Sequence, residues 1–329
     1  MTEWPSFASA LAPVIVSYLA LKRALGRQYH AECVVLRQVD RFLAARASDL
    51  TPDTFAAWCL TLQHLAADTR REYLRIVRNL CGYRRRSQPT AFVPERPPFR
   101  WPRHKFRPHL FTDLEVARLL VTADALAPTP TSPLRRETFR LAIVILYTAG
   151  LRCGELVRLT VGDYDPAAHT LIIRDSKFYK SRVVPLSADG AREVDRYLAV
   201  RRSRRLPASP DSPLLWHRFR GGAWSGDAFG HRMHALFRRA GIRTVAGKLP
   251  RVHDFRHGFA VEALLRWYRA GANVQAKLPF LATYMGHASI VSTEYYLQFI
   301  EPLAASASEA FARHCGAVVT APVTLGGAS

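Results

Sequence analysis

Tyr296 is the residue that could do the most demanding chemistry in this chain. It stands nine positions after His287 of the pair Gly286-His287, directly beside a second tyrosine, Tyr295. A phenol has a reference pKa of about 10, so it is a poor nucleophile unless a base or nearby cations favour the phenolate. Taken alone, a tyrosine in an apolar helix is more often part of a core. Tyr296 therefore becomes a candidate nucleophile only if the fold brings cations to it.

Three earlier segments contain such cations. Arg152 follows Gly150, a natural C-cap where an apolar helix is expected to end, and such a junction can turn an arginine into a cleft. His253 and Arg256 are i, i+3 neighbours in a predicted helix, so an imidazole and a guanidinium can contact one phosphate. Lys177 lies in a polar turn between two β-rich runs, from which it can reach a leaving-group oxygen.

A metal site is the competing interpretation of the histidines. His253 and His257 are i, i+4, as in helical zinc sites, but Asp254 stands where the motif H-E-x-x-H has Glu. No third ligand occurs at a suitable spacing, and the five cysteines are scattered with no C-x-x-C pair. We therefore expect no metal and reduced cysteines.

In chain order, these segments resemble the tyrosine recombinase (phage integrase) family, whose pattern is Arg, Lys in a β-hairpin, His-x-x-Arg, Gly-His and Tyr. The resemblance covers Thr112 to Ile300. It implies a two-domain, mainly α fold with a small β-sheet or hairpin, in which a helical core-binding domain precedes a mixed α/β catalytic domain. It also implies six catalytic residues, namely Arg152, Lys177, His253, Arg256, His287 and Tyr296.

The resemblance assigns a role to each of these residues. Arg152 and Arg256 would neutralise the non-bridging phosphate oxygens, to which His287 would donate a further hydrogen bond. His253 would help to take the proton from Tyr296, and the hairpin lysine would protonate the departing 5′ oxygen. The product is a 3′-phosphotyrosyl link, which permits religation without ATP, a metal or another cofactor. Tyr295 remains the rival nucleophile.

The elements that must position these residues follow from the apolar periodicity. Residues 1–86 are expected to form a helical DNA-clamp domain, with Thr51 as an N-cap before Pro52. Residues 87–108, with six prolines, are expected to form a basic linker. Residues 109–300 would be the catalytic domain, opening with a capping box from Thr112 to Glu115 and containing a hairpin of runs 171–173 and 183–186.

The end of the chain is expected to form helix to about residue 315, followed by a flexible tail. Residues 301–329 are therefore predicted to form a C-terminal helix and a tail. Leu303, Ala307 and Phe311 form a weak apolar stripe there, and family members often pack this region onto a neighbouring protomer.

The charge of the chain points to a polyanionic partner. The formal net charge is +21 and the isoelectric point is about 10.5, with arginine favoured over lysine. Double-stranded DNA is the expected partner, with two copies on a site and four in a synapse, or with related recombinase subunits. One helix carries an arginine stripe at i, i+4, i+7 whose like charges repel unless an anion neutralises them. The candidate DNA contacts are Arg71, Arg75, Arg78, Arg103, Lys105, Lys180 and Arg182.

The remaining patterns limit the class of protein. No apolar run approaches the roughly 20 residues of a membrane span, and the first residues lack the order of a secretion signal, so we expect a cytoplasmic protein. The predicted function is site-specific DNA cleavage and rejoining, that is, integration or recombination of the DNA of a mobile element, and the sequence leaves open whether the outcome is integration, excision, transposition or resolution. The alternatives are relaxation of DNA by a type IB topoisomerase-like enzyme, a DNA-binding protein without catalysis, which belongs to another class, and thirdly a zinc hydrolase.

Overall fold

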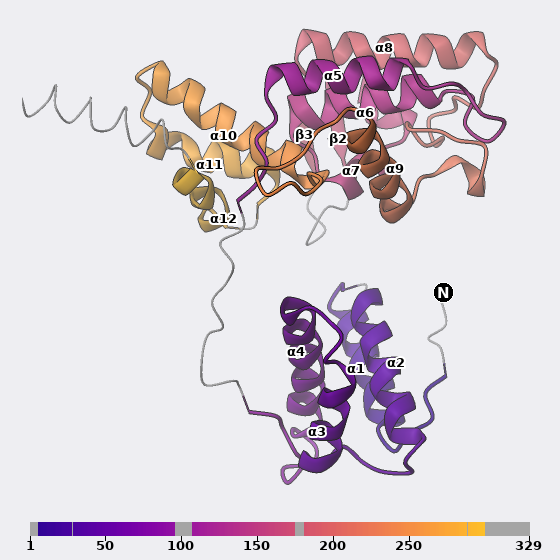
Figure 1. Cartoon of the computed structure of the whole chain (residues 1–329), viewed down its shortest axis with the longest axis vertical. Coiled ribbons are helices and arrows are strands. Elements are labelled where there is room, and N and C mark those ends of the chain that lie inside the picture. The colour runs from indigo at the N-terminus through magenta and orange to yellow at the C-terminus, as the bar shows by residue number, and fades with distance from the viewer. Residues whose placement is uncertain (1–5, 28, 96–106, 175–180, 288, 300–329) are drawn as a thin grey trace, which may run out of the picture. The chain divides into compact units, whose positions relative to one another are not determined.

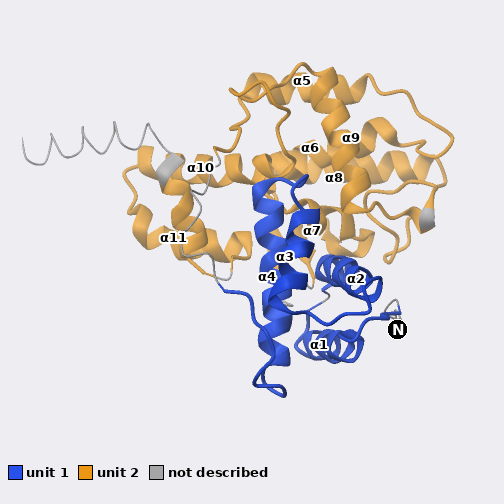
Figure 2. Cartoon of the chain, turned by 60° about the horizontal axis from the view of Figure 1, so that its bottom comes forward, with its two compact units in different colours: residues 1–104 blue, residues 105–329 orange. Residues whose placement is uncertain are grey.

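The computed structural model describes residues 6–27, 29–95, 107–174, 181–287 and 289–299. The chain divides into two compact units, Met1–His104 and Lys105–Ser329, which Figure 2 shows in two colours. Both units are mainly helical, and the second also holds a small sheet, so the predicted fold class is confirmed. The predicted linker lies partly, and residues 301–329 entirely, outside the described residues, so the domain boundaries and the C-terminal stripe stay predictions.

Unit 1 is built from four helices around one apolar core. Tyr18, Leu36 and Trp58 are among its most buried side chains. Asp40, also buried, accepts hydrogen bonds from the backbone N–H groups of Ala8 and Ser9 and so ties the start of the unit to α2. The helices are α1 (Ala12–Ala24), α2 (His30–Ala44), α3 (Pro52–Thr61) and α4 (Ala67–Arg84).

Two predicted helix starts are confirmed. Thr51 caps α3, with its side chain accepting from the N–H group of Thr54, and Pro52 stands at the first helical position. In unit 2, Thr112 accepts from the N–H group of Glu115, whose carboxylate accepts in return from the N–H group of Thr112 at 2.9 Å. These N-terminal capping patterns therefore fix the first residues of α3 in unit 1 and of α5 in unit 2.

Unit 2 is centred on α6, whose residues 141–146 are almost wholly buried except for Val144. This helix contacts α5, α8 and α10, and α10 to α12 lie together at one end of the unit (Figure 1). The helices are α5 (Asp113–Asp124), α6 (Arg135–Ala149), α7 (Cys153–Arg158), α8 (Ala188–Ser203), α9 (Gly226–Arg239), α10 (His253–Arg269), α11 (Val274–Met285) and α12 (Val291–Glu294). Three 3-10 helices are η1 (Val161–Asp163), η2 (Arg220–Gly222) and η3 (Tyr295–Phe299).

The sheet has one more strand than the sequence predicted. The expected hairpin is present as β2 (Thr170–Ile173) and β3 (Arg182–Pro185), which pair antiparallel with Leu171 opposite Val184. A third strand, β1 (Tyr164–Asp165), pairs with the other edge of β2. Two residues are too few to show an alternating pattern, which is why the prediction missed β1.

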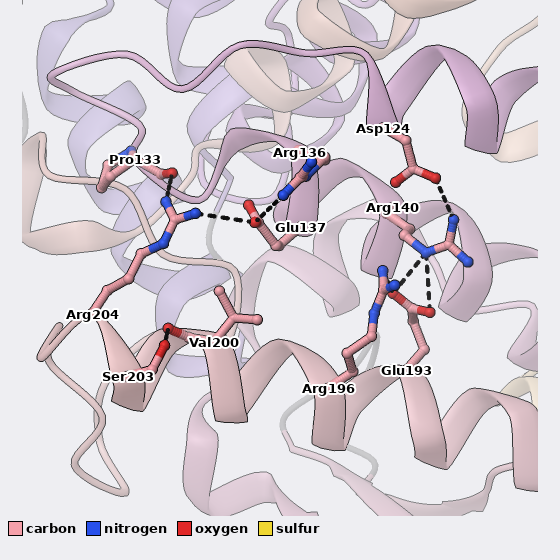
Figure 3. Close-up of polar contacts among 10 residues, drawn as sticks. All are labelled: Asp124, Pro133, Arg136, Glu137, Arg140, Glu193, Arg196, Val200, Ser203 and Arg204. Carbon is pink, nitrogen blue, oxygen red and sulfur yellow. Dashed lines mark hydrogen bonds and ion pairs between the residues drawn. The ribbon is translucent and has the colours of Figure 1, made fainter.

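Charged side chains join α6 to α8. Glu193 of α8 is buried and accepts from Arg140 of α6 at 3.1 Å and from Arg196 of its own helix at 2.8 Å (Figure 3). Arg140 also pairs with Asp124 at the end of α5, at 2.6 Å. Glu137, equally buried, also pairs with two arginines, which are Arg136 of α6 and Arg204, the residue that follows α8 (Figure 3). Each buried carboxylate is thus shared by two cations, which offsets its loss of hydration.

Candidate active site

An open pocket of about 440 Å³ brings together five of the six predicted catalytic residues. They come from separate elements, since Arg152 precedes α7, His287 follows α11 and Tyr296 lies in η3. The other two, His253 and Arg256, lie in the first turn of α10. The sixth, Lys177, lies outside the described residues together with its turn, residues 175–180. The complete lining is Arg152, His253, Arg256, His257, His287, Val291, Ser292, Tyr295 and Tyr296.

The first turn of α10 is fixed by residues that point away from the pocket. Phe255 is fully buried and stacks on Phe111, with ring centroids 4.1 Å apart. Asp254, also buried, accepts from the backbone N–H group of Arg251 at 2.8 Å. With these two side chains held, the i, i+3 pair of His253 and Arg256 faces the pocket, as its spacing predicts.

The junction between α6 and α7 positions Arg152. As predicted, α6 ends at a left-handed glycine, since Gly150 has φ +59°. A Cβ atom there would lie 2.5 Å from Cδ1 of Phe259, so the position requires glycine for space as well as for conformation. Arg152, the N-cap residue of α7, donates to Oε1 of Glu155 at 2.6 Å and to the carbonyl of Gly286 at 2.8 Å. Its guanidinium is therefore aimed into the pocket by two acceptors.

Glu155 is a functional candidate that the sequence interpretation did not single out. Its side chain is 1% exposed, and it binds Arg152 of its own turn and Arg182 of β3. Burial acts to raise its pKa, but hydrogen bonds and charge from these arginines outweigh burial and hold the pKa at about 2. Its position three residues after Arg152 was the only local indication available in the sequence.

Tyr296 lies inside the pocket and Tyr295 at its edge. Tyr296 is 3% exposed, against 37% for Tyr295. Its ring meets His257 edge-on at 5.4 Å and lies nearly parallel to His287 at 6.1 Å, measured between centroids. The two tyrosines lie in a 3-10 helix rather than the expected α-helix, and consecutive 3-10 residues still point about 120° apart. Only Tyr296 is therefore enclosed by the cationic groups.

Burial and cations act in opposite directions on the Tyr296 phenol. Burial raises its pKa above the ordinary value, while the charges of Arg256 and Arg152 and a hydrogen bond with Arg256 lower it. Arg256 itself is 1% exposed and donates to the carbonyl of Gly150 at 2.9 Å and to that of Met285. Burial, followed by the charge of Arg152, lowers the pKa of Arg256 to about 10. The site thus holds cations beside a phenol that is protonated at neutral pH.

The three histidines of the pocket are neutral at pH 7. Burial, and then the nearby cations, lower the pKa of His253 and His287 to about 4 and that of His257 to about 3. His253 is exposed to solvent although its ring lines the pocket, so the charges of Arg256 and Arg251 are needed beside burial to lower its pKa. Nδ1 of His287 is hydrogen-bonded to the hydroxyl of the buried Thr293 at 2.8 Å, which fixes the ring.

Two arginines of the α4 stripe are paired with acids of the same helix. Arg71 pairs with Asp68 at 3.0 Å, and Arg75 donates through Nε to Glu72 at 2.8 Å, each one helical turn back. Arg78, the last arginine of the stripe, donates through Nε to the carbonyl of Pro94 at 2.8 Å. Acids at i−3 offset two of the three charges, so repulsion within the stripe does not by itself require a phosphate, and contact of Arg71, Arg75 and Arg78 with DNA stays a prediction.

The other predicted DNA contacts divide into two groups. Arg103, Lys105 and Lys180 lie outside the described residues. Arg182 is 10% exposed and turned inward, with its guanidinium on Glu155. The prediction that Arg182 contacts DNA does not fit this placement.

Two further observations concern the described residues alone. His253 and His257 lie with ring centroids 4.8 Å apart, but no group of three metal-ligating side chains gathers there or elsewhere in the described part of the chain. None of the described helices has the length and apolar character needed to cross a membrane.

Known proteins resemble this chain over most of its length. The phage integrase family model matches residues 111–300. The chain is 32% identical over 309 residues to the putative integrase/recombinase y4rE of Sinorhizobium fredii, covering 93% of this chain and 97% of the relative. It is 30% identical over 292 residues to y4rB of the same organism, covering 88% and 93%. Tyrosine recombinase XerD of Mycobacterium leprae is 32% identical over 160 residues, covering 48% of this chain and 46% of XerD.

Solved structures share the fold at lower identity. The Tn1549 transposon integrase in complex with transposon right end DNA has a TM-score of 0.62 at 18% identity, covering 91% of this chain and 98% of that one. The XerH site-specific recombinase bound to palindromic difH substrate has a TM-score of 0.60 at 19% identity, covering 85% and 78%.

Proposed function

The chain belongs to the phage integrase family of DNA cleaving and rejoining enzymes, and from this premise we propose that it recombines DNA through a covalent bond to Tyr296. The observation that carries the proposal is the pocket itself. It encloses one tyrosine with two guanidiniums and three neutral imidazoles drawn from three separate parts of unit 2. Such a set suits the attack of a hydroxyl on a phosphodiester, because the transition state spreads negative charge over the non-bridging oxygens.

The proposed step forms one bond to phosphorus and breaks another. Oη of Tyr296 attacks the scissile phosphorus, the bond to the 5′ oxygen breaks, and the products are a 3′-phosphotyrosyl link and a free 5′ hydroxyl. Arg152 and Arg256 neutralise the non-bridging oxygens, while His253, neutral in the free site, accepts the phenol proton. Attack by another 5′ hydroxyl reverses these changes and joins the strands, so no external energy source is consumed.

Two further groups complete the proposal. If the hydroxyl of Thr293 donates to Nδ1 of His287, then Nε2 carries the proton and can donate to the phosphate. Lys177, outside the described residues, is proposed to protonate the leaving 5′ oxygen, a role suited to a flexible ammonium on a turn.

The biological outcome of the recombination reaction is a separate proposal. The two relatives that match almost the whole chain are both putative integrase/recombinase proteins, which supports DNA integration as the outcome. A mobile element as the integrated DNA is part of the proposal. The substrate would be double-stranded DNA, with two copies of the chain on a site and four in the synapse, or with related recombinase subunits. Covalent joints of the wild type at one shared sequence would argue against a topoisomerase-like activity, which would leave joints without a shared sequence.

The test is to trap covalent protein–DNA complexes in cells that express wild-type, Tyr296→Phe or Tyr295→Phe protein, and to sequence the attached 3′ ends. The wild type and Tyr295→Phe should yield joints that share one sequence, and Tyr296→Phe should yield none. Joints from Tyr296→Phe would overturn the assignment of the nucleophile. Absence of joints from the wild type would indicate a DNA-binding protein without catalysis.

A further inference from the structure

Three arginines meet at the C-terminus of α11. The carbonyl groups of residues 284–286 each accept a hydrogen bond from a different guanidinium, those of Arg182 at 2.7 Å, Arg256, and Arg152 at 2.8 Å. The last carbonyl groups of a helix lack intrahelical partners and carry the negative end of the helix dipole, so they attract cations. Two of the three arginines are the proposed phosphate clamp. The third, Arg182, has no role in the proposed reaction.

Arg182 is fully engaged inside unit 2. Its Nε atom donates to the carbonyl of Tyr284, while Nη1 and Nη2 donate to the two carboxylate oxygens of Glu155 at 3.1 and 2.9 Å. Its side chain is 10% exposed and that of Glu155 is 1% exposed. The planar fork of a guanidinium can hold a carboxylate and a carbonyl together in this way, whereas a single ammonium nitrogen cannot.

Glu155 links Arg182 to the proposed phosphate clamp. The same Oε1 atom that accepts from Arg182 accepts from Arg152 at 2.6 Å. Without Arg182, only the Arg152 side of this carboxylate would be held, and Arg152 would lose the fixed acceptor that sets its direction. The two arginines therefore depend on one buried carboxylate for their relative placement.

The turn before His287 is held by the same arginines. A Cβ atom at Gly286 would lie 2.9 Å from Nη1 of Arg182 and 3.4 Å from Nη1 of Arg152. The left-handed conformation at this glycine, φ +65°, ends α11 and sends the chain to His287. Both guanidiniums thus lie directly against the backbone that carries the histidine.

We propose that Arg182 is a positioning residue of the active site, which fixes Arg152 and the turn carrying His287 by joining β3 to Glu155 and to the end of α11. The inference rests on the proposed function, because it concerns the geometry of the cleavage step. It also connects the hairpin to the clamp, since β3 begins five residues after Lys177.

The test compares Arg182→Met and Arg182→Lys with Arg174→Met in the full chain. Arg174 is the matched control because it flanks the same hairpin but is 62% exposed, in an ion pair with Asp163. The probe is a nicked suicide duplex carrying the sequence recovered from wild-type joints. Half-site binding is measured by gel shift, the rate of covalent-complex formation in a single turnover at saturating DNA, and folding by thermal unfolding.

Both Arg182 variants should bind DNA within about 3-fold of wild type but cleave about 10- to 100-fold more slowly, because misplacing a reacting group by about 1 Å costs about 100-fold. The Arg174→Met variant should retain the wild-type rate. Cleavage at the wild-type rate by Arg182→Lys would overturn the proposal, because it would show that only the positive charge of Arg182 matters. A loss of DNA binding large enough to explain the whole decrease in cleavage rate would also overturn it, because it would show that Arg182 contacts DNA. If Arg182→Met does not fold, Arg182→Lys decides alone, since it keeps the stem and the charge. A wild type without covalent complex would instead refute the proposed function.

Discussion

Replacing Gly286 with alanine separates the conformational role of this glycine from its contact with the arginines. Gly271, which follows α10, is the control, because its φ of +67° nearly equals the +65° of Gly286 but an added Cβ would meet nothing within 4 Å. Placing an L-residue in the left-handed region costs about 1 kcal/mol. Both variants should therefore lose about 1 kcal/mol of unfolding free energy from this source.

Only the Gly286 variant should also disturb the clamp. Its Cβ would lie 2.9 Å from Nη1 of Arg182, whereas ordinary contact begins at 3.4 Å, so the two groups must separate by 3.4 − 2.9 = 0.5 Å. That movement strains the hydrogen bond from Arg152 to the carbonyl of Gly286, which is 2.8 Å long. Since a displacement of about 1 Å can cost about 100-fold in rate, a displacement of about half that size predicts a cleavage rate that is about 10-fold lower.

The assay combines urea unfolding, followed by circular dichroism, with single-turnover formation of the covalent complex on a suicide duplex. Gly286→Ala should be about 10-fold slower than Gly271→Ala at a similar stability. Equal cleavage rates in the two variants would refute the reasoning, because they would show that the arginines tolerate movement at the end of α11.

Three further predictions concern charges that the fold buries. Because the pKa of Glu155 is held at about 2, its ion pairs stabilise the protein above the usual carboxyl range and are lost as the pH falls towards 2. The stability advantage of wild type over Glu155→Gln should shrink by about 2 kcal/mol between pH 6 and pH 3 in urea titrations. Glu193→Gln should lower the unfolding free energy by about 1 to 3 kcal/mol. Asp189→Asn is the control, because Asp189 of α8 forms an ion pair with Arg192 in which both side chains are exposed, and this change should alter the unfolding free energy by less than about 0.5 kcal/mol. Equal losses would contradict a special role for burial. In NMR titrations of the free protein, His253 and His287 should stay neutral down to about pH 5, with midpoints near 4, and ordinary midpoints would show that the site is less enclosed than the structure indicates.

Local patterns in the sequence carried most of the correct predictions of the fold. The N-cap at Thr51, the capping box at Thr112 and the helix end at Gly150 depend on residues within a few positions, so spacing alone identifies them. The helix expected at the end of the chain is present in the described residues as the separate helices α10, α11 and α12. Glycines at 271 and 286, which follow α10 and α11, adopt left-handed conformations, and Tyr295–Phe299 form the 3-10 helix η3.

The site was predictable where its geometry is local and not where it is long-range. The spacing of His253 and Arg256 in one helix sufficed to place them on one face. By contrast, Arg182 meets the carbonyl of a residue 102 positions away, and Arg152 meets one 134 positions away. No spacing rule connects such positions, so the sequence assigned Arg182 to DNA, whereas the structure turns it towards Glu155.

The chemistry proposed for Tyr296 depends on the order in which charges enter the pocket. In the free site, burial raises the pKa of the phenol, whereas burial together with the nearby cations lowers the pKa of His253 to about 4, so His253 is a weak base for this proton. A DNA phosphate bound by Arg152 and Arg256 would add negative charge beside His253 and offset the cations that lower its pKa. The pKa of the imidazole would then rise towards its ordinary value of about 6.5, which strengthens it as a base. The substrate itself would therefore complete the group that deprotonates the nucleophile, and the phenolate would form only when a scissile phosphate is present to accept it.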